Sequence, residues 1–540
     1  MEPFLSFTGK RWVLDAAADD AGSVVEQLRR RRGITEDDGT SWYDPLRYPD
    51  ARKAAERVRA ACARGETVGI FGDYDCDGIT STAQMLRLFR RHGVEPVVRL
   101  PHRVHDGYGL KPSHIDEFAA RSVTLIVTVD TGIVAFDALE SARAKGIDVI
   151  ILDHHHCEER PDAFAIVHPA FAQAFPEPHP SAAGVVFSFV HAVEGEDWPD
   201  RDTDLALAMM GTIADVVPLL GANRRLVIEG LSAVRRLPAG PLRTFVDSIG
   251  NGSALSASDI AFRIAPRINA AGRMADPLLA LDALLIGGEA LEHLHMLNTR
   301  RQEETERAVT HALREMGGRQ TGSLPPFLTA ASASYTPGTV GLIAGKLSER
   351  YGRPSLVAHI ADDVCTASLR SPTGYHVTEA LTRVAHLLTN FGGHAQAAGA
   401  TFPLAHATEL FALLEADASE RIPPDQLVPA LTMDGILSPA VLTRDLCASL
   451  RTLEPFGQGN PEPLFLIPNV TLTAPRLCGK AGAHLQATVG HVKIIGFGLG
   501  PLLDHLRAPV DLAVRLGIDT WNGRESVQLM VTDIRSSIEY

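Results

Sequence analysis

Three aspartates lie close together near the start of the chain, in the stretch GDYDCDGIT at residues 72–80. Asp73, Asp75 and Asp77 alternate with uncharged residues, so an extended segment would place all three carboxylates on one side. Like charges at this spacing repel one another and raise each other's pKa unless a cation lies among them. The stretch therefore indicates a site for a bound cation.

Further polar residues follow apolar runs downstream: Asp130, Asp153, His154, His155 and Asp215. Taken singly, each has a bland explanation as a turn aspartate, a solvated loop or a cap. If they meet at one edge of a sheet, however, carboxylates and imidazoles form an oxygen-rich site with some nitrogen. Such a site suits Mn²⁺ or Mg²⁺ better than a metal that prefers thiolates, and the number of ligands favours a metal pair.

The elements that must position these residues alternate between strand and helix from about residue 66 to 170. Apolar runs predict five strands, at residues 66–71, 94–100, 124–129, 147–152 and 164–167. Stretches between them, such as 81–93, predict amphipathic helices. This alternation is typical of a parallel sheet that is covered on both faces and binds ligands beyond the carboxyl ends of its strands. The polar residues follow three of those ends.

Length and composition are those of a globular protein with several domains. The chain has 540 residues, 45% of them hydrophobic, whereas single cores stop growing at about 250–300 residues. We find no membrane-spanning run, no signal peptide and no CxxC pair among six cysteines, so we expect a cytoplasmic protein with reduced thiols. A net charge of −14 argues against a protein that coats nucleic acid but leaves room for a local basic channel.

The motifs GDYDCDG, DTG, DHH and GTIADVVPL are similar to the four motifs of the DHH phosphoesterase superfamily. Within it, the chain resembles the branch of bacterial single-stranded-DNA-specific exonucleases along nearly its whole length. That resemblance is carried by DP (44–45), LPHRVHDGYGL (100–110), RINAAGRM (267–274), SLRS (368–371), GGHAQAAG (392–399) and PFGQGNPEPLF (455–465).

The resemblance implies an α/β protein with four parts. These are a parallel-sheet DHH domain, a connecting long helix, an α/β DHHA1 domain and a C-terminal OB-like β-barrel. The expected boundaries are an N-terminal extension at 1–50, the DHH catalytic domain at 51–220, a helical connector at 221–320, the DHHA1 substrate-binding domain at 321–405 and an OB-like nucleic-acid-binding domain at 430–540.

The same resemblance implies two Mn²⁺ or Mg²⁺ ions. Asp75 would hold one ion, Asp77, His154 and Asp215 the other, and Asp130 would bridge them. His155 would contact the scissile phosphate, and Asp153 could orient a neighbouring histidine. The sequence departs from the pyrophosphatase branch at Phe71, where that branch has a histidine ligand. Asp73 then either substitutes as a ligand or only accepts backbone hydrogen bonds.

Substrate contacts are expected from arginines, whose planar fork suits phosphate, and from small or neutral residues beside them. The candidates are Arg103, Tyr108, Arg267, Asn269, Arg273, Ser368, Arg370, Gly392, Gly393 and His394. For each arginine a surface salt bridge is the alternative, and Tyr108 fits a packed core as well as a base stack.

The expected function is 5′→3′ exonucleolytic hydrolysis of single-stranded DNA in repair and recombination. The implied partners are single-stranded DNA, a single-strand-binding protein and a helicase; we expect a monomer with no membrane contact. The alternatives are a nanoRNase or oligonucleotide phosphodiesterase on the same core, and a non-catalytic DNA-binding scaffold. From about residue 430 we expect control of substrate length without chemistry, through candidates such as Arg476, Lys480, Trp521 and Arg524.

Overall fold

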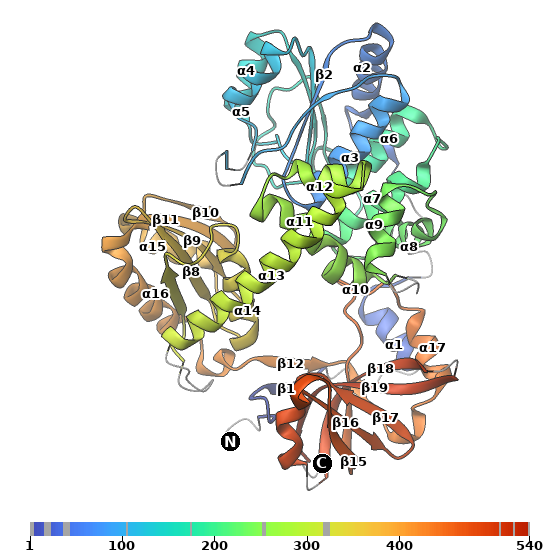
Figure 1. The fold of residues 1–540 in the computed structure, drawn as a ribbon, viewed down its shortest axis with the longest axis vertical. Coiled ribbons are helices and arrows are strands. Elements are labelled where there is room, and N and C mark those ends of the chain that lie inside the picture. Colours follow the sequence, from blue (N-terminus) through green and yellow to red (C-terminus); the bar gives the residue numbers. More distant parts are fainter. Residues whose placement is uncertain are drawn as a thin grey trace. The chain divides into compact units, whose positions relative to one another are not determined.

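The structure is a computed structural model, and Figure 1 shows its helices and strands. The chain divides into two compact units. Residues 32–303 and 455–461 form the parallel-sheet unit; residues 1–31, 304–454 and 462–540 form the mixed-sheet unit. The structure describes residues 5–15, 23–35, 44–103, 106–107, 109–172, 175–250, 255–316, 324–506, 509–521 and 524–537.

Five parallel strands form the sheet of the parallel-sheet unit, in the order β3-β2-β4-β5-β6. They are β2 (Val68–Gly72), β3 (Val97–Arg99), β4 (Leu125–Val129), β5 (Asp148–Leu152) and β6 (Ala165–Val167). The parallel sheet and all five of its strands predicted from apolar runs are confirmed.

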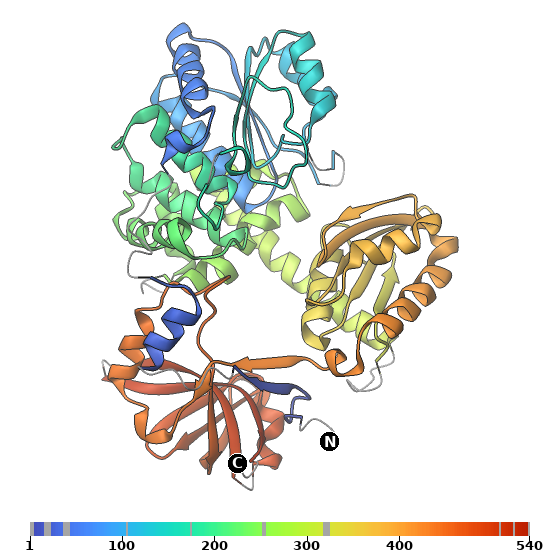
Figure 2. The ribbon, with the colours of Figure 1, turned by 180° about the vertical axis from the view of Figure 1, so that it is seen from behind.

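Helices cover both faces of this sheet (Figure 2). Successive strand residues point to opposite faces, so neighbouring side chains enter separate cores. Ile70 packs in a core with α2 (Ala51–Arg64), α3 (Cys76–Arg91) and α6 (Ala182–Glu194). Its neighbour Phe71 packs on the other face with α4 (Pro112–Ala120) and α5 (Phe136–Ala144). The sheet is therefore buried on both sides, as continuous apolar strands require.

The extended conformation expected for the three aspartates is wrong. Strand β2 ends at Gly72, and α3 begins at Cys76 instead of near residue 81. Asp75 is the N-cap of α3, and its Oδ1 accepts hydrogen bonds from the backbone N–H groups of Asp77 (3.0 Å) and Gly78 (3.1 Å). A helix leaves its first N–H groups without partners, so a cap aspartate favours starting the helix here.

Further helices extend the parallel-sheet unit beyond the sheet. They include α7 (Arg201–Ala214), α8 (Gly221–Arg236), α9 (Pro241–Ile249), α11 (Ala265–Met274) and α12 (Leu278–Leu285). The long helix α13 (Glu289–Glu315) follows and continues into the mixed-sheet unit, so the predicted connecting helix is confirmed.

A five-stranded sheet in the mixed-sheet unit has the order β10-β11-β9-β8-β7, and only β7 and β8 are parallel. Its elements are β7 (Leu328–Ser332), α14 (Val340–Tyr351), β8 (Ser355–Ala361), β9 (Val364–Arg370), α15 (Val377–Arg383), β10 (Asn390–Gly393), β11 (Ala397–Pro403) and α16 (Ala407–Arg421).

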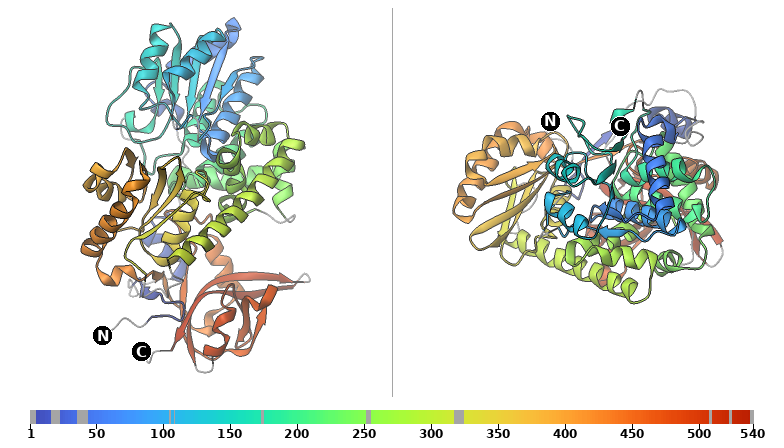
Figure 3. Two further views of the ribbon diagram at one scale, coloured as in Figure 1. Left: turned by 60° about the vertical axis from the view of Figure 1, so that its left-hand side comes forward. Right: turned by 90° about the horizontal axis from the view of Figure 1, so that it is seen from above.

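A seven-stranded sheet follows, in the order β13-β14-β18-β19-β17-β16-β15 (orange and red in Figure 3). Its strands are β13 (Gly435–Ile436), β14 (Phe465–Val470), β15 (Thr473–Cys478), β16 (His484–Val489), β17 (Val492–Gly496), β18 (Val510–Trp521) and β19 (Arg524–Ser536). Among the described residues, no helix combines the length and apolar character needed to cross a membrane.

The N-terminal segment joins this C-terminal region. Strand β1 (Arg11–Leu14) pairs in parallel with β12 (Ala430–Met433). Trp12 Nε1 donates a 2.9 Å hydrogen bond to Asp533, which is fully buried. Residues at opposite ends of the sequence therefore complete one structure.

Candidate metal centre

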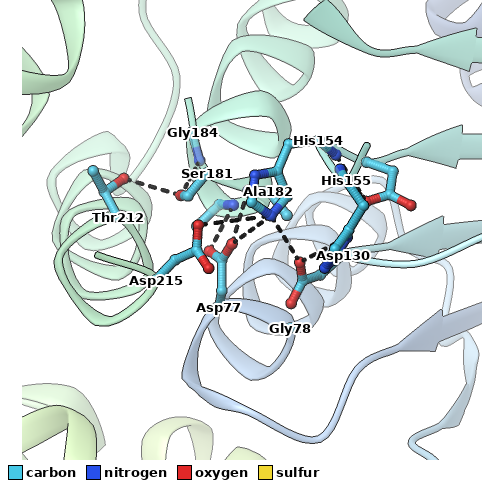
Figure 4. A network of polar contacts seen from close by, with 12 residues as sticks. Asp77, Gly78, Asp130, His154, His155, Ser181, Ala182, Gly184, Thr212 and Asp215 are labelled. Atoms are coloured by element: carbon cyan, nitrogen blue, oxygen red, sulfur yellow. Dashed lines mark hydrogen bonds and ion pairs between the residues drawn. The ribbon is translucent and has the colours of Figure 1, made fainter. Parts of the chain in front are cut away.

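The predicted acidic and histidine residues meet at the carboxyl ends of the parallel strands (Figure 4). Asp73 follows β2, Asp130 follows β4, and His154 follows β5. Helix α3 supplies Asp77 in its first turn, and Asp215 is the C-cap of α7. The sheet edge and two helix ends thus converge on one point.

One group of ligands, the acid–imidazole trio, contains Asp77, His154 and Asp215. His154 Nε2 lies 3.7 Å from Asp215 Oδ2 and 3.8 Å from Asp77 Oδ2. A second group, the aspartate trio, contains Asp73, Asp75 and Asp130. Asp130 also lies beside the first group, because its Oδ1 is 3.4 Å from His154 Nε2. The arrangement offers two adjoining places for a cation with Asp130 between them.

Two buried atoms at this point support a cation. His154 Nε2 and Asp73 Oδ1 make no hydrogen bond within the described part of the chain. A buried polar atom without a hydrogen bond is costly and rare in folded proteins, so each calls for a partner. A divalent cation accepts lone pairs from both imidazole nitrogen and carboxylate oxygen, and the donor set is the one that Mn²⁺ or Mg²⁺ prefers.

The pKa shifts of these carboxylates and of His154 also indicate a site for a bound cation. Burial, and after it the charge of Asp75, raises the pKa of Asp77 to about 7. Burial and the charges of Asp77 and Asp75 raise the pKa of Asp215 to about 9. The pKa values of Asp73 and Asp130 are also well above the ordinary range, chiefly through burial. Burial lowers the pKa of His154 to about 4, so its imidazole is neutral and able to bind a metal.

The backbone around Asp77 holds its carboxylate in place. Its two oxygens accept hydrogen bonds from the N–H groups of Ala182 (2.8 Å) and Ala183 (2.9 Å), at the start of α6. Gly211 of α7 lies against the same carboxylate, where a Cβ would be 2.5 Å from Asp77 Oδ1. The helix N-terminus favours the charged form of Asp77, and the glycine allows α7 to approach it.

Asp130 adopts an unusual backbone conformation, with φ of 59°. Its N–H donates a 3.0 Å hydrogen bond to the carbonyl of Leu152 in β5. Non-glycine residues rarely adopt positive φ, although Asp tolerates it better than most. Such strain often lies at functional sites, where the surrounding structure enforces it.

Asp153 orients His155, as the sequence suggested. Asp153 Oδ1 accepts hydrogen bonds from the backbone N–H groups of His154 (2.8 Å) and His155 (3.2 Å) and from His155 Nδ1 (2.7 Å). Burial opposes a charged imidazole, but Asp153 outweighs it and raises the pKa of His155 to about 9. Asp153 itself has a pKa of about 2, because its hydrogen bonds and the charge of His155 overcome the effect of burial.

Phe71, which replaces the histidine of the pyrophosphatase branch, is buried in β2 and packs beside His114, with ring centroids 4.9 Å apart. It therefore offers no ligand. Asp73 is 5% exposed, and its carboxylate lies within the aspartate trio. This placement favours the ligand role for Asp73 over the purely structural alternative.

Several predicted substrate residues lie in the parallel-sheet unit. The guanidinium of Arg103 stacks on Tyr74, 5.2 Å from the ring centroid. Arg267 and Arg273 both belong to α11, where Arg267 donates to the carbonyl of Arg263. Tyr108 lies outside the described residues. Contacts of these residues with a substrate stay predictions.

Asn269 has a structural contact that the sequence did not reveal. Its Oδ1 accepts a 2.7 Å hydrogen bond from the N–H of Cys76, at the start of α3. Three residues along α11, a Cβ on Gly272 would lie 2.6 Å from the carbonyl oxygen of Tyr74. The RINAAGRM motif thus packs on the loop that carries Asp73 and Asp75. The one signal in the sequence was a glycine inside a helix, which often marks a close backbone approach.

The other predicted substrate residues lie in the mixed-sheet unit. On β9, Arg370 Nη1 donates a 3.0 Å hydrogen bond to Ser368 Oγ. Gly392 and Gly393 end β10, and the exposed His394 follows them. Farther along, Arg476 on β15 donates to Gln486, whereas the side chains of Trp521 and Arg524 lie outside the description. Two clusters of predicted residues therefore belong to separate units.

Three family models match the chain. The DHH family N-terminal domain matches residues 67–213, the DHHA1 domain matches 325–420, and the RecJ OB domain matches 433–533. They follow the predicted order of domains, and the third covers the seven-stranded sheet. The exact boundaries predicted from the sequence stay predictions.

Curated relatives and a solved structure extend the likeness over most of the chain. The single-stranded-DNA-specific exonuclease RecJ of Escherichia coli (strain K12) is 34% identical over 528 residues, with 89% of each chain covered. RecJ of Bacillus subtilis (strain 168) is 32% identical over 508 residues, and the match covers 91% of this chain but 64% of that longer relative. The crystal structure of RecJ from Thermus thermophilus in complex with Mn²⁺ aligns with a TM-score of 0.84 at 29% identity. The alignment covers 98% of this chain and 80% of that chain.

Proposed function

The chain belongs to the RecJ family of single-stranded-DNA-specific exonucleases, and on this premise we propose that it hydrolyses single-stranded DNA from one end with the help of two divalent ions. The observation that carries the proposal is the pair of adjoining ligand trios at the end of the parallel sheet. The cofactor is Mn²⁺ or Mg²⁺.

The residues divide between the two ions as follows in this proposal. Asp73 and Asp75 would hold one ion, Asp77, His154 and Asp215 would hold the other, and Asp130, which lies beside both groups, would contribute to both. Two such ions, when bound, supply an activated water molecule and balance the charge that develops on the phosphoryl oxygens. The pairing of Asp77 with the start of α6 keeps its carboxylate fixed and ready to bind.

His155 contacts the scissile phosphate in the proposed mechanism. Its Nδ1–H donates to Asp153, which fixes the orientation of the ring. Because its pKa is about 9, the imidazole carries a positive charge at neutral pH in the metal-free site and attracts a phosphate. Arg370 and Ser368 are proposed to bind a second phosphate, and their mutual hydrogen bond holds the guanidinium fork in place.

The finer parts of the proposal rest on the family alone. They are the 5′→3′ polarity, a role in repair and recombination, a monomeric state, and cooperation with a single-strand-binding protein and a helicase. Because the substrate is cellular DNA, we propose that the enzyme works in the cytoplasm.

Digestion of one oligonucleotide carrying a label at either end tests the function. With Mn²⁺ or Mg²⁺, the 5′ label should appear early as a mononucleotide, while the 3′-labelled strand shortens gradually. Chelation with EDTA should stop both reactions, and a duplex of the same sequence should stay intact. Asp130→Ala should abolish cleavage with the fold preserved.

Other outcomes would contradict the proposal. Cleavage confined to the shortest oligonucleotides would support the oligonucleotide phosphodiesterase. DNA binding without cleavage in the presence of either metal would support the non-catalytic scaffold.

A further inference from the structure

The turn that follows Asp215 is covered by a segment from far along the chain. Residues 455–461 belong to the parallel-sheet unit, although the residues on both sides of them belong to the mixed-sheet unit. The carbonyl of Gln458 accepts a 2.8 Å hydrogen bond from the N–H of Leu219. A Cβ on Gly457 would lie 2.6 Å from Leu219 Cδ1, so glycine leaves room for the Leu219 side chain.

The covering segment is itself rigid. Gly457 and Asn460 exchange two backbone hydrogen bonds, of 2.9 and 3.1 Å. The Asn460 side chain is fully buried, and its amide donates a 2.9 Å hydrogen bond to the carbonyl of Pro455. Arg32 donates a further 2.9 Å hydrogen bond to Asn460 Oδ1. The segment therefore presents the Gln458 carbonyl from a fixed loop.

The turn under this loop needs such support. Val216 has φ of 62°, a conformation that costs a β-branched residue free energy and persists only where the surroundings enforce it. On its other side, the amide of Asn223 donates a 3.1 Å hydrogen bond to the carbonyl of Pro218. The backbone of Val216–Leu219 is thus held between α8 and the covering segment, and Asp215 immediately precedes it.

We propose that residues 455–461 are a positioning segment for the metal centre, acting through Leu219 on the carboxylate of Asp215. The inference rests on the proposed function, since it assumes that Asp215 binds a metal ion. It predicts that a disturbance at Gly457 weakens the cation site of the acid–imidazole trio. The aspartate trio shares no residue with that turn, so its affinity for a cation should not change.

A volume-matched exchange in the full-length chain tests this positioning role. Gly457→Val adds three carbon atoms facing Leu219, and Leu219→Ala removes three, so the double variant conserves the volume at the contact. Mn²⁺ titration followed by electron paramagnetic resonance measures both sites. Gly457→Val should weaken one Mn²⁺ site by about 10- to 100-fold, the range for lost support of metal ligands, and leave the other unchanged. The double variant should restore most of the affinity.

One control and one milder variant separate positioning from general damage. Gly435→Val places the same side chain on β13, where the nearest atom to the new Cβ is 3.9 Å away, and should change neither site. If Gly457→Val fails to fold, Gly457→Ala, which adds one methyl group against Leu219, carries the same comparison.

Unchanged Mn²⁺ affinity in a folded Gly457 variant would overturn the proposal. So would equal loss at both sites, or no rescue in the double variant. If the unaltered protein does not cut single-stranded DNA, the proposed function fails, and the Mn²⁺ titration still decides this inference.

Discussion

Asp153 Oδ1 lies 2.7 Å from His155 Nδ1 and also accepts the backbone N–H groups of His154 and His155. Asp153 is fully buried, whereas the His155 side chain is 39% exposed. One oxygen therefore fixes both the start of the loop that follows β5 and the orientation of the His155 imidazole. It also keeps the imidazole charged, because it raises the pKa of His155 to about 9 against the effect of burial.

Asp153→Asn should consequently change the pH dependence of cleavage. Without the carboxylate charge, burial lowers the pKa of His155, so the imidazole loses its proton at a lower pH. Cleavage by the variant should fall by about 10- to 100-fold near pH 8 and by less near pH 6. Rates across this range, with the His155 titration followed by NMR, measure the effect. Asp162→Asn, which alters an exposed pair with Arg143, is the control, and parallel profiles would contradict the role of Asp153.

Metal-free protein should lose stability as the pH rises. The pKa values of Asp77 (about 7) and Asp215 (about 9) are raised on folding, so the folded state binds more protons than the unfolded chain. Their contribution is complete below the unfolded pKa near 4 and is lost through pH 7 to 9. In EDTA, the melting temperature of the parallel-sheet unit should therefore decrease from pH 6 to pH 9. Asp215→Asn should flatten this decrease, and an unchanged slope would show that the carboxylates are not coupled to folding.

Added Mn²⁺ should reverse this trend. Binding at a hundred times the Kd stabilises a folded protein by about 2.7 kcal/mol per site. Protons compete with the metal for Asp77 and Asp215, so the increase in melting temperature should be larger at pH 9 than at pH 6. Calorimetric scans at matched Mn²⁺ concentrations check this, and a larger increase at pH 6 would contradict it.

Gly211→Ala should damage the metal centre from inside a helix. The new Cβ would lie 2.5 Å from Asp77 Oδ1 and 2.6 Å from Thr80 Oγ1, so the carboxylate or α7 must move. We expect a loss of about 1–3 kcal/mol in stability, as for other overpacked sites, together with weaker Mn²⁺ binding. Gly345→Ala is the matched control, because it lies within α14 with nothing within 4 Å of its Cβ. It should be neutral or stabilising.

Two shortened chains that differ by seven residues test what the C-terminal region contributes. A chain of residues 32–461 keeps the segment that covers Leu219, and a chain of residues 32–454 loses it. We expect the longer one to bind Mn²⁺ at least about tenfold more tightly and to cleave short oligonucleotides faster. A cut at residue 430 would remove this segment together with the seven-stranded sheet. Equal metal affinity in both chains would show that the segment is dispensable.

Neither shortened chain should digest long strands as well as the full-length protein at low salt, and this difference should shrink as the salt concentration rises. The C-terminal region carries exposed cations, such as Arg476 on β15 and Lys480 in the turn that follows this strand, and contacts of this kind with phosphates weaken as salt increases. Digestion of long and short strands over a salt series measures the difference. Equal digestion of long strands by the full-length and shortened chains would contradict a role in substrate length.

The buried parallel sheet was predictable because it leaves a strong pattern. Strands covered on both faces are continuous apolar runs, and Asp130 or His154 directly after such a run lies at a known edge. The start of α3 was not predictable in this way. Gly78 looks like a helix breaker, yet the first turn of α3 requires glycine here, because a Cβ would lie 2.5 Å from the Asp73 carbonyl oxygen. That contact exists only in the folded loop.

Contacts between distant segments were the part that the sequence could not supply. The sequence predicts a substrate contact for Asn269, but its hydrogen bond to Cys76 joins residues that are 193 positions apart. Gln458 acts on Leu219 through its backbone carbonyl, which any residue possesses. A side-chain pattern carries no information about such a contact.

Because β1 pairs with β12, β1 cannot join its sheet until the ribosome has synthesised residue 430 and those that follow it. At about 5–20 residues per second, Ala430 follows Leu14 out of the ribosome after about 20 to 80 s. Throughout that interval β12, the partner strand of β1, has not been synthesised. Asp533, which accepts the hydrogen bond from Trp12, has not been synthesised either. The strands of the parallel sheet, which end at Val167, are complete much earlier. The first strand of the chain is therefore among the last to enter its sheet, and a nascent chain that stalls before residue 430 exposes an open strand edge to aggregation.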